Sequence, residues 1–162
     1  MEKLVVRVSK VLTFCFGLAL LGSGYFLGQN DALLSPAEAA AAPAKTKVVY
    51  HISDAKGQAL AGLRNISNHL DTAPDTEIVV VAHADGIDFL MTDYEDAMNV
   101  EPLISTLESR GVKFEVCEIT LKRRNIGKDE FMLFMEEDNF VPSGVVRIAE
   151  LQSKQGFAYL KP

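Results

Sequence analysis

A continuous apolar run over residues 78–82 limits the folds open to this chain more than any other feature of the sequence. Five apolar residues, four of them β-branched, follow one another without a polar interruption. A strand with this composition has no polar face to turn toward water, which is typical of a central strand in a parallel sheet, buried on both faces. The sequence therefore predicts a central strand over residues 77–83.

Strand-like and helix-like segments alternate on both sides of this run. Short stretches rich in β-branched and aromatic residues predict strands at 47–53, 77–83, 112–117, 140–141 and 157–160. Helical spacing and helix-boundary residues predict helices at 60–70, from Pro102 to Gly111, at 129–137, and from the N-cap Ser143 to Gly156. This alternation predicts an α/β fold, in which right-handed crossovers place helices on both faces of a parallel sheet.

The composition is that of one acidic globular domain. The chain has 162 residues, a net charge of −6 and a pI of about 5.1. Binding to nucleic acid requires a basic surface, and the three basic residues at 122–124 are too few to form one. Residues 53–58, which follow the first predicted strand, contain a single glycine, so no phosphate-binding loop supports a nucleotide cofactor. We therefore predict neither a nucleic-acid partner nor a cofactor.

The first 44 residues predict export of the domain that follows. Three basic residues precede the uncharged apolar segment 11–28, and a run of small residues with a cleavage candidate at Ala37-Glu38-Ala39 comes after it. This order is that of a signal peptide. Because the apolar segment reaches the lower limit for a membrane span, an uncleaved inner-membrane anchor is the alternative. Both interpretations place a single domain, residues 45–162, in the periplasm.

Three candidate functional side chains lie at the ends of predicted strands. His51, His83 and Cys117 each stand near the carboxyl end of one of the first three strands. Ligands gather at this edge of a parallel sheet, so these residues are expected to share one rim. Whether they converge depends on the strand order, which the sequence does not determine.

Cys117 is the candidate reactive thiol, because the only other cysteine, Cys15, lies in the apolar N-terminal segment and no disulfide framework is available. A helix beginning at Cys117 and the basic residues 122–124 would lower the pKa of the thiol, whereas Glu115 and Glu118 would raise it. The alternative is a small buried cysteine that closes a strand. The residues alone leave both interpretations open.

Two other chemistries are compatible with the same three side chains. Thiolate and imidazole groups are zinc ligands, so Cys117, His51 and His83 could form a metal site. A nucleophilic Cys–His pair is also allowed. Neither has a local signature, since the sequence contains no CxxC or HxxxH spacing at these positions. We predict no bound metal.

Four segments of the predicted domain carry a family resemblance. They are KVVYHIS at 47–53, GVKFEVC at 111–117 with RRNI at 123–126, VPSGV at 141–145, and LQSKQGFAYLKP at 151–162. These segments resemble the DsrE/DsrF-like proteins of sulfur oxidation and sulfur relay, which have the YchN-like fold. The resemblance implies a three-layer α/β/α domain with a five-stranded, mostly parallel sheet, and assembly into trimers or hexamers.

The resemblance also implies a function. In sulfur-relay members, a cysteine matching Cys117 carries sulfane sulfur as a persulfide between a donor and an acceptor thiol. Arg123 and Arg124 match a basic pair that would help to hold the anion, and His51 and His83 are the other candidate binding residues. The implied function is that of a periplasmic, sulfurtransferase-like sulfur carrier. The alternative is a non-catalytic oligomeric module that binds a small ligand or metal, with a structural Cys117.

The implied location separates this chain from the well-known relay members, which are cytoplasmic. An acceptor protein in the cytoplasm could not reach an exported domain. The only contact with a membrane would be through an uncleaved N-terminal segment. Donor and acceptor are therefore expected to be thiol or sulfane-sulfur compounds outside the cytoplasm.

Overall fold

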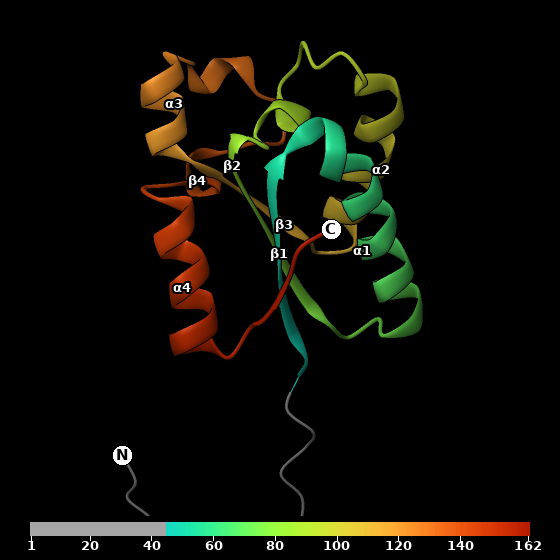
Figure 1. The fold of residues 1–162 in the computed structure, drawn as a ribbon. Coiled ribbons are helices and arrows are strands. Elements are labelled where there is room, and N and C mark those ends of the chain that lie inside the picture. The colour runs from blue at the N-terminus through green and yellow to red at the C-terminus, as the bar shows by residue number, and fades with distance from the viewer. Residues whose placement is uncertain (1–44) are drawn as a thin grey trace, which may run out of the picture. The chain divides into compact units, whose positions relative to one another are not determined.

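Five parallel strands form the centre of the domain in this computed structural model, which describes residues 45–162 (Figure 1). They are β1 (Lys47–Asp54), β2 (Glu77–Asp85), β3 (Lys113–Cys117), β4 (Phe140–Val141) and β5 (Ala158–Leu160). Their order in the sheet is β4-β3-β2-β1-β5, and every neighbouring pair is parallel. The predicted α/β class and five-stranded sheet are confirmed. The predicted export segment, its cleavage site and Cys15 lie outside the described residues.

Helices cover both faces of the sheet and complete the three layers. The α-helices of the described part are α1 (Leu60–Thr72), α2 (Ala97–Ser109), α3 (Glu118–Arg124) and α4 (Gly144–Gln155). Figure 1 shows α1 and α2 on one side of the strands and α4 on the other, with α3 beyond the end of β3. Within residues 45–162, no helix combines the length and the apolar character needed to cross a membrane.

The central run on β2 is buried on both faces, as its composition predicts. Ile78, Val80 and Ala82 belong to the larger core, which also contains apolar residues of α1 and α2. Val79 and Val81 point the other way and pack with Ile148 and Leu151 of α4. Because alternate residues face opposite sides of a sheet, a strand between two helix layers can have no polar face.

The prediction of a helix over residues 129–137 is wrong. Two short 3₁₀ turns, Lys128–Glu130 and Glu137–Asn139, lie at the ends of this segment. Between them Phe131 forms an antiparallel bridge with Met91, and Leu133 is fully exposed. Pairing with a distant segment therefore overrides the apolar spacing that favoured a helix.

The second predicted helix begins earlier than expected. α2 starts at Ala97, and Pro102 lies inside it on the exposed side rather than at its first position. Its end agrees with the prediction, because Gly111 follows with the left-handed φ of 86° that glycine adopts without strain.

Candidate functional site

The strand register places the three candidate side chains on one face of the sheet. His51 of β1 pairs with Val81 of β2, and Val81 pairs with Glu115 of β3. His83 and Cys117 each lie two residues beyond these partners and therefore point to the same face. Val81 packs against α4, so this row of polar side chains runs along the α4 face at the carboxyl edge of the sheet.

The two histidines are in direct contact. His51 Nε2 lies 2.6 Å from His83 Nε2, whereas the ring centroids are 4.6 Å apart, so the rings meet through their nitrogen edges. The other ring nitrogen of His51, Nδ1, lies 2.7 Å from the hydroxyl of Tyr159 on edge strand β5. Tyr159, His51 and His83 thus form a continuous hydrogen-bonded chain across three adjacent strands.

Burial and a nearby lysine keep both imidazoles neutral. Burial, followed by the charges of His83 and Lys161, lowers the pKa of His51 to about 4. Burial and the charge of Lys161 also lower the pKa of His83. Lys161 follows β5 and places its Nζ 3.1 Å from the hydroxyl of Ser53. Near neutral pH the histidine pair therefore carries no added proton.

Cys117 lies where β3 ends and α3 begins, and it is only 5% exposed. Burial raises the pKa of its thiol, but hydrogen bonds outweigh this effect and leave the pKa below its ordinary value. These bonds come from the backbone of Gly144, Thr120 and Ile119 and from the Thr120 side chain. Helix-end backbone groups therefore favour the thiolate.

Gly144, the first residue of α4, brings Cys117 and His83 together. A Cβ atom on Gly144 would lie 3.2 Å from the Cβ of Cys117 and 3.3 Å from the Cβ of His83. Its backbone also contributes a hydrogen bond to the thiol. The absence of a side chain at this position lets α4 close over both residues.

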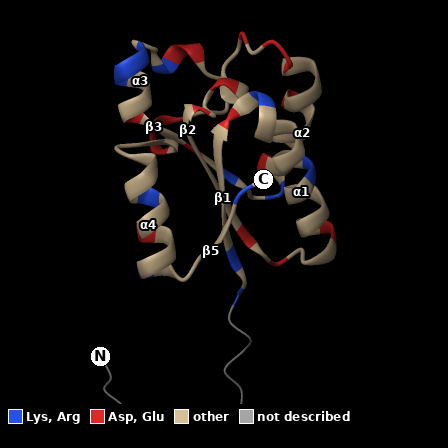
Figure 2. Ribbon diagram, in the orientation of Figure 1, with Lys and Arg blue, Asp and Glu red and all other residues tan. Residues whose placement is uncertain are grey.

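The predicted basic pair after Cys117 faces other groups. The guanidinium of Arg124 lies 2.5 Å from a carboxylate oxygen of Asp88 and 4.0 Å from Asp85. Arg123 is exposed and has no ion pair within residues 45–162. Figure 2 shows basic stretches of the described chain interspersed with acidic ones, including the basic end of α3. The structure therefore attributes the lowered thiol pKa to hydrogen bonds from neutral groups instead of to these arginines.

The two glutamates that were expected to oppose the thiolate have cationic partners. Glu115 receives two 2.7 Å hydrogen bonds from Arg147 of α4. Glu118 accepts a 3.0 Å bond from Lys128 and lies 3.7 Å from Lys122. The bond from Lys128 lowers the pKa of Glu118. Neither carboxylate therefore acts on Cys117 as an uncompensated charge.

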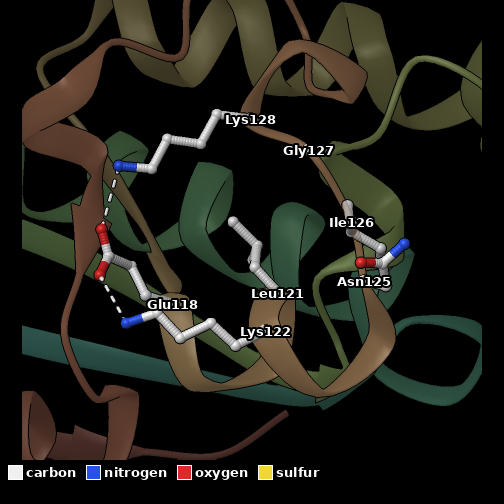
Figure 3. Close-up of a pocket in the computed structure, with 7 residues that line it drawn as sticks. All are labelled: Glu118, Leu121, Lys122, Asn125, Ile126, Gly127 and Lys128. Atoms are coloured by element: carbon white, nitrogen blue, oxygen red, sulfur yellow. Dashed lines mark hydrogen bonds and ion pairs between the residues drawn. The ribbon is translucent and has the colours of Figure 1, made fainter.

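Glu118 and its two lysines also line the pocket shown in Figure 3, which has a volume of about 490 Å³. The pocket is lined by Glu118, Leu121, Lys122, Asn125, Ile126, Gly127 and Lys128. Cys117 and the histidines are not among these residues. Its charged side chains pair with one another, and none of its lining residues belongs to the row formed by His51, His83 and Cys117.

The zinc site that the sequence allows would need three ligands gathered in one place. Within the described residues, no three His, Cys, Asp or Glu side chains gather as a ligand set. His51 and His83 contact each other directly, and Cys117 does not complete a three-ligand set with them.

Sequence reasoning missed Tyr159, Thr120, Gly144 and Arg147. Tyr159 and Gly144 lie in the segments 151–162 and 141–145 that carry the family resemblance. Tyr159 reaches the site because β5 lies beside β1, and Gly144 reaches it because α4 begins just after β4, which lies beside β3. No sequence motif marks Thr120 or Arg147. Each takes part in the site only through a contact, Thr120 with Cys117 and Arg147 with Glu115.

Comparisons with known proteins agree with this fold. A sequence model of the DsrE/DsrF-like family matches residues 37–162. A solved structure of a protein of unknown function, MTH1491 from Methanobacterium thermoautotrophicum, is similar with a TM-score of 0.64 and 28% identity. The match covers 73% of this chain and all of the archaeal chain. The comparison with curated proteins gives no match.

Proposed function

The chain belongs to the DsrE/DsrF-like family, and on that premise we propose that it carries sulfane sulfur as a persulfide on Cys117. The observation that supports this most is the set of hydrogen bonds from Gly144, Thr120 and Ile119, which lowers the pKa of the thiol. A thiolate is the form that attacks sulfur. Cys117, the cysteine that the family resemblance selects, is therefore also a cysteine whose surroundings lower the pKa of its thiol.

The proposed reaction is thiol exchange in two steps. The Cys117 thiolate attacks the sulfane sulfur of a donor, forming a new S–S bond while the donor's own bond to that sulfur breaks. With thiosulfate as donor, the products are the Cys117 persulfide anion and sulfite, so charge and electrons balance. An acceptor thiol then takes the sulfane sulfur and releases the Cys117 thiolate.

Burial supports a second candidate function. Cys117 is 5% exposed beneath the first turn of α4, which is the environment of a structural cysteine. In that case the domain is a binding module, and the hydrogen-bonded side chains of His51, His83 and Tyr159 hold a small ligand. Reactivity of the thiol in the folded protein separates the two functions.

We also propose that the domain acts in the periplasm as a homo-oligomer. The order of basic, apolar and small residues in the first 44 positions supports export. Oligomerisation rests on the family. N-terminal sequencing of protein isolated from cells tests cleavage after Ala39 against a retained anchor, and light scattering tests assembly into a trimer or hexamer.

The function is tested by incubating the full-length chain with thiosulfate and, separately, with polysulfide. Intact mass spectrometry should show the gain of at least one sulfur atom, and peptide mapping should assign it to Cys117 rather than Cys15. Cys117→Ser should carry none at that peptide. A folded wild-type protein that gains no sulfur and resists alkylation at Cys117 would establish the structural role instead.

A further inference from the structure

The chain formed by Tyr159, His51 and His83 leads from the surface to the immediate surroundings of Cys117. Tyr159 is 39% exposed on the edge strand β5, and both histidines are half-buried. At the inner end, the Cβ atoms of His83 and Cys117 each lie within 3.3 Å of the position that a Cβ on Gly144 would occupy. The chain thus connects solvent with the residues around the thiol.

The contact between the two Nε2 atoms requires one proton between them when both rings are neutral. If His51 donates this proton, its Nδ1 accepts from the Tyr159 hydroxyl, and His83 carries its own proton on Nδ1. If His83 donates instead, His51 Nδ1 donates to the Tyr159 oxygen, and His83 Nδ1 is left as an acceptor. A shift of protons along the chain therefore switches His83 Nδ1 between donor and acceptor.

We propose that Tyr159, His51 and His83 form a proton relay for sulfur transfer at Cys117, in which His83 takes the proton of the acceptor thiol and returns it to the transferred sulfur. This inference rests on the proposed function, because it concerns the second step of the same reaction. His83 would be the catalytic residue. His51 and Tyr159 would be positioning residues, because the arrangement of their protons sets whether His83 Nδ1 can accept one.

The step balances without an oxidant or reductant. His83 removes the proton of the acceptor thiol RSH, and RS⁻ attacks the terminal sulfur of the Cys117 persulfide. An R–S bond to that sulfur forms, the S–S bond to Cys117 breaks, and Cys117 leaves as a thiolate. The proton passes from His83 to the transferred sulfur, so RSH and the Cys117 persulfide anion give RSSH and the Cys117 thiolate.

The surroundings of the pair suit this role. Burial and the charge of Lys161 lower the pKa of both imidazoles, so at pH 7 both rings are neutral and each has one nitrogen lone pair, at the cost of lower basicity than a free imidazole. Tyr159 of β5 and Cys117 of β3 are titratable groups on the same face near this edge of the sheet. Glu115 lies two residues before Cys117 on β3, and its ion pair with Arg147 of α4 compensates its charge.

The test compares two rates in the full-length chain. The first is loading of Cys117 with thiosulfate, in which the thiolate attacks directly. The second is transfer from loaded Cys117 to glutathione, followed by loss of one sulfur atom from the intact mass. The relay acts in the second step, so the ratio of transfer rate to loading rate isolates its contribution.

The variants His83→Gln, His51→Gln and Tyr159→Phe remove one member each. At pH 7 we expect the ratio to fall about 100-fold for the histidine variants, the lower range for general acid–base catalysis, and about tenfold for Tyr159→Phe. The loss should shrink above about pH 8.5, where the acceptor thiol ionises without a base. Added imidazole should restore transfer in His83→Gly, an effect that a purely structural histidine would not produce.

A second histidine–tyrosine pair serves as the matched control. Tyr50 Oη lies 3.2 Å from His69 Nδ1 in the last turn of α1, and His69→Gln should leave the ratio unchanged. Tyr159→Phe removes only an exposed hydroxyl, so it remains informative if a histidine variant fails to fold. A wild type that cannot be loaded would refute the proposed function. Normal loading with an unchanged ratio in Tyr159→Phe would overturn the relay alone.

Discussion

The ion pair between Glu115 and Arg147 provides the sharpest test of how the site is held together. Glu115 lies on β3, its side chain is 8% exposed, and it receives two 2.7 Å hydrogen bonds from Arg147. Arg147 lies three residues after Gly144 on α4, and its hydrogen bonds to Glu115 raise the pKa of its guanidinium. This pair therefore fixes the first turn of α4, which bonds to Cys117, onto the sheet.

The structure predicts unequal costs for the two single substitutions. Arg147→Met leaves a buried carboxylate without a partner, which costs about 3–5 kcal/mol. Glu115→Gln leaves a guanidinium that is already 25% exposed and can turn toward water, so we expect a loss of about 1–2 kcal/mol. The double variant should lose less than the sum of the two, because neither charge is then stranded.

The measurement is the free energy of unfolding in urea at pH 7, followed by circular dichroism, for all four members of the cycle. An exposed pair on the same helix, Lys154 and Glu150 at 3.0 Å, supplies the control. Lys154→Met should cost less than about 0.5 kcal/mol. Equal costs for Arg147→Met and Lys154→Met, or an additive double variant, would refute the claim that the Glu115–Arg147 pair holds α4 in place.

Three further results are expected. Thr120→Val should slow alkylation of Cys117 by iodoacetamide about tenfold at pH 7, because it removes a hydrogen bond that lowers the thiol pKa; Thr120→Ser, which keeps the hydroxyl, should not. Gly144→Ala should reduce stability in urea by about 1–3 kcal/mol, because its Cβ would crowd Cys117 and His83. The lowered pKa of His51 means that unfolding takes up protons, so stability should fall as the pH drops from 6.5 through about 4. Solvent screening limits this loss of stability to about 1 kcal/mol. Over the same pH range, the urea midpoint of His51→Gln should decline less than that of the wild type. An equal decline would contradict a lowered pKa at His51.

The class of the fold could be predicted from the sequence because burial leaves a periodic mark. The apolar run on β2 and the apolar spacing on α1 and α4 follow directly from which faces touch the two cores. The apolar spacing of residues 129–137 also favours a helix, but a bridge between Phe131 and Met91, forty positions apart, determines their conformation instead. Local spacing cannot distinguish a helix face from a segment that pairs with a distant strand.

From the sequence, the candidate site could be predicted only as a set of side chains that share one edge of the sheet. His51 and His83 meet because β1 and β2 are neighbours, and the sequence does not determine that order. The charges near Cys117 were harder to place. Arg124 pairs with Asp88, 36 positions earlier, and Glu115 pairs with Arg147, 32 positions later. Charges adjacent in sequence to the thiol are thus compensated by distant partners, and sequence proximity misidentifies what acts on it.

The surroundings of the Cys117 thiol and the hydrogen-bonded side chains of His83, His51 and Tyr159 belong to different elements of the fold, and Gly144 contacts both. Hydrogen bonds from α3 and α4 lower the pKa of Cys117, whereas His83, His51 and Tyr159 extend away from it along β2, β1 and β5. These side chains lie at strand ends, outside the packing of most of the two cores. Substitutions of Tyr159, His51 or His83 are therefore expected to change the proposed proton transfer while the pKa of the Cys117 thiol stays lowered.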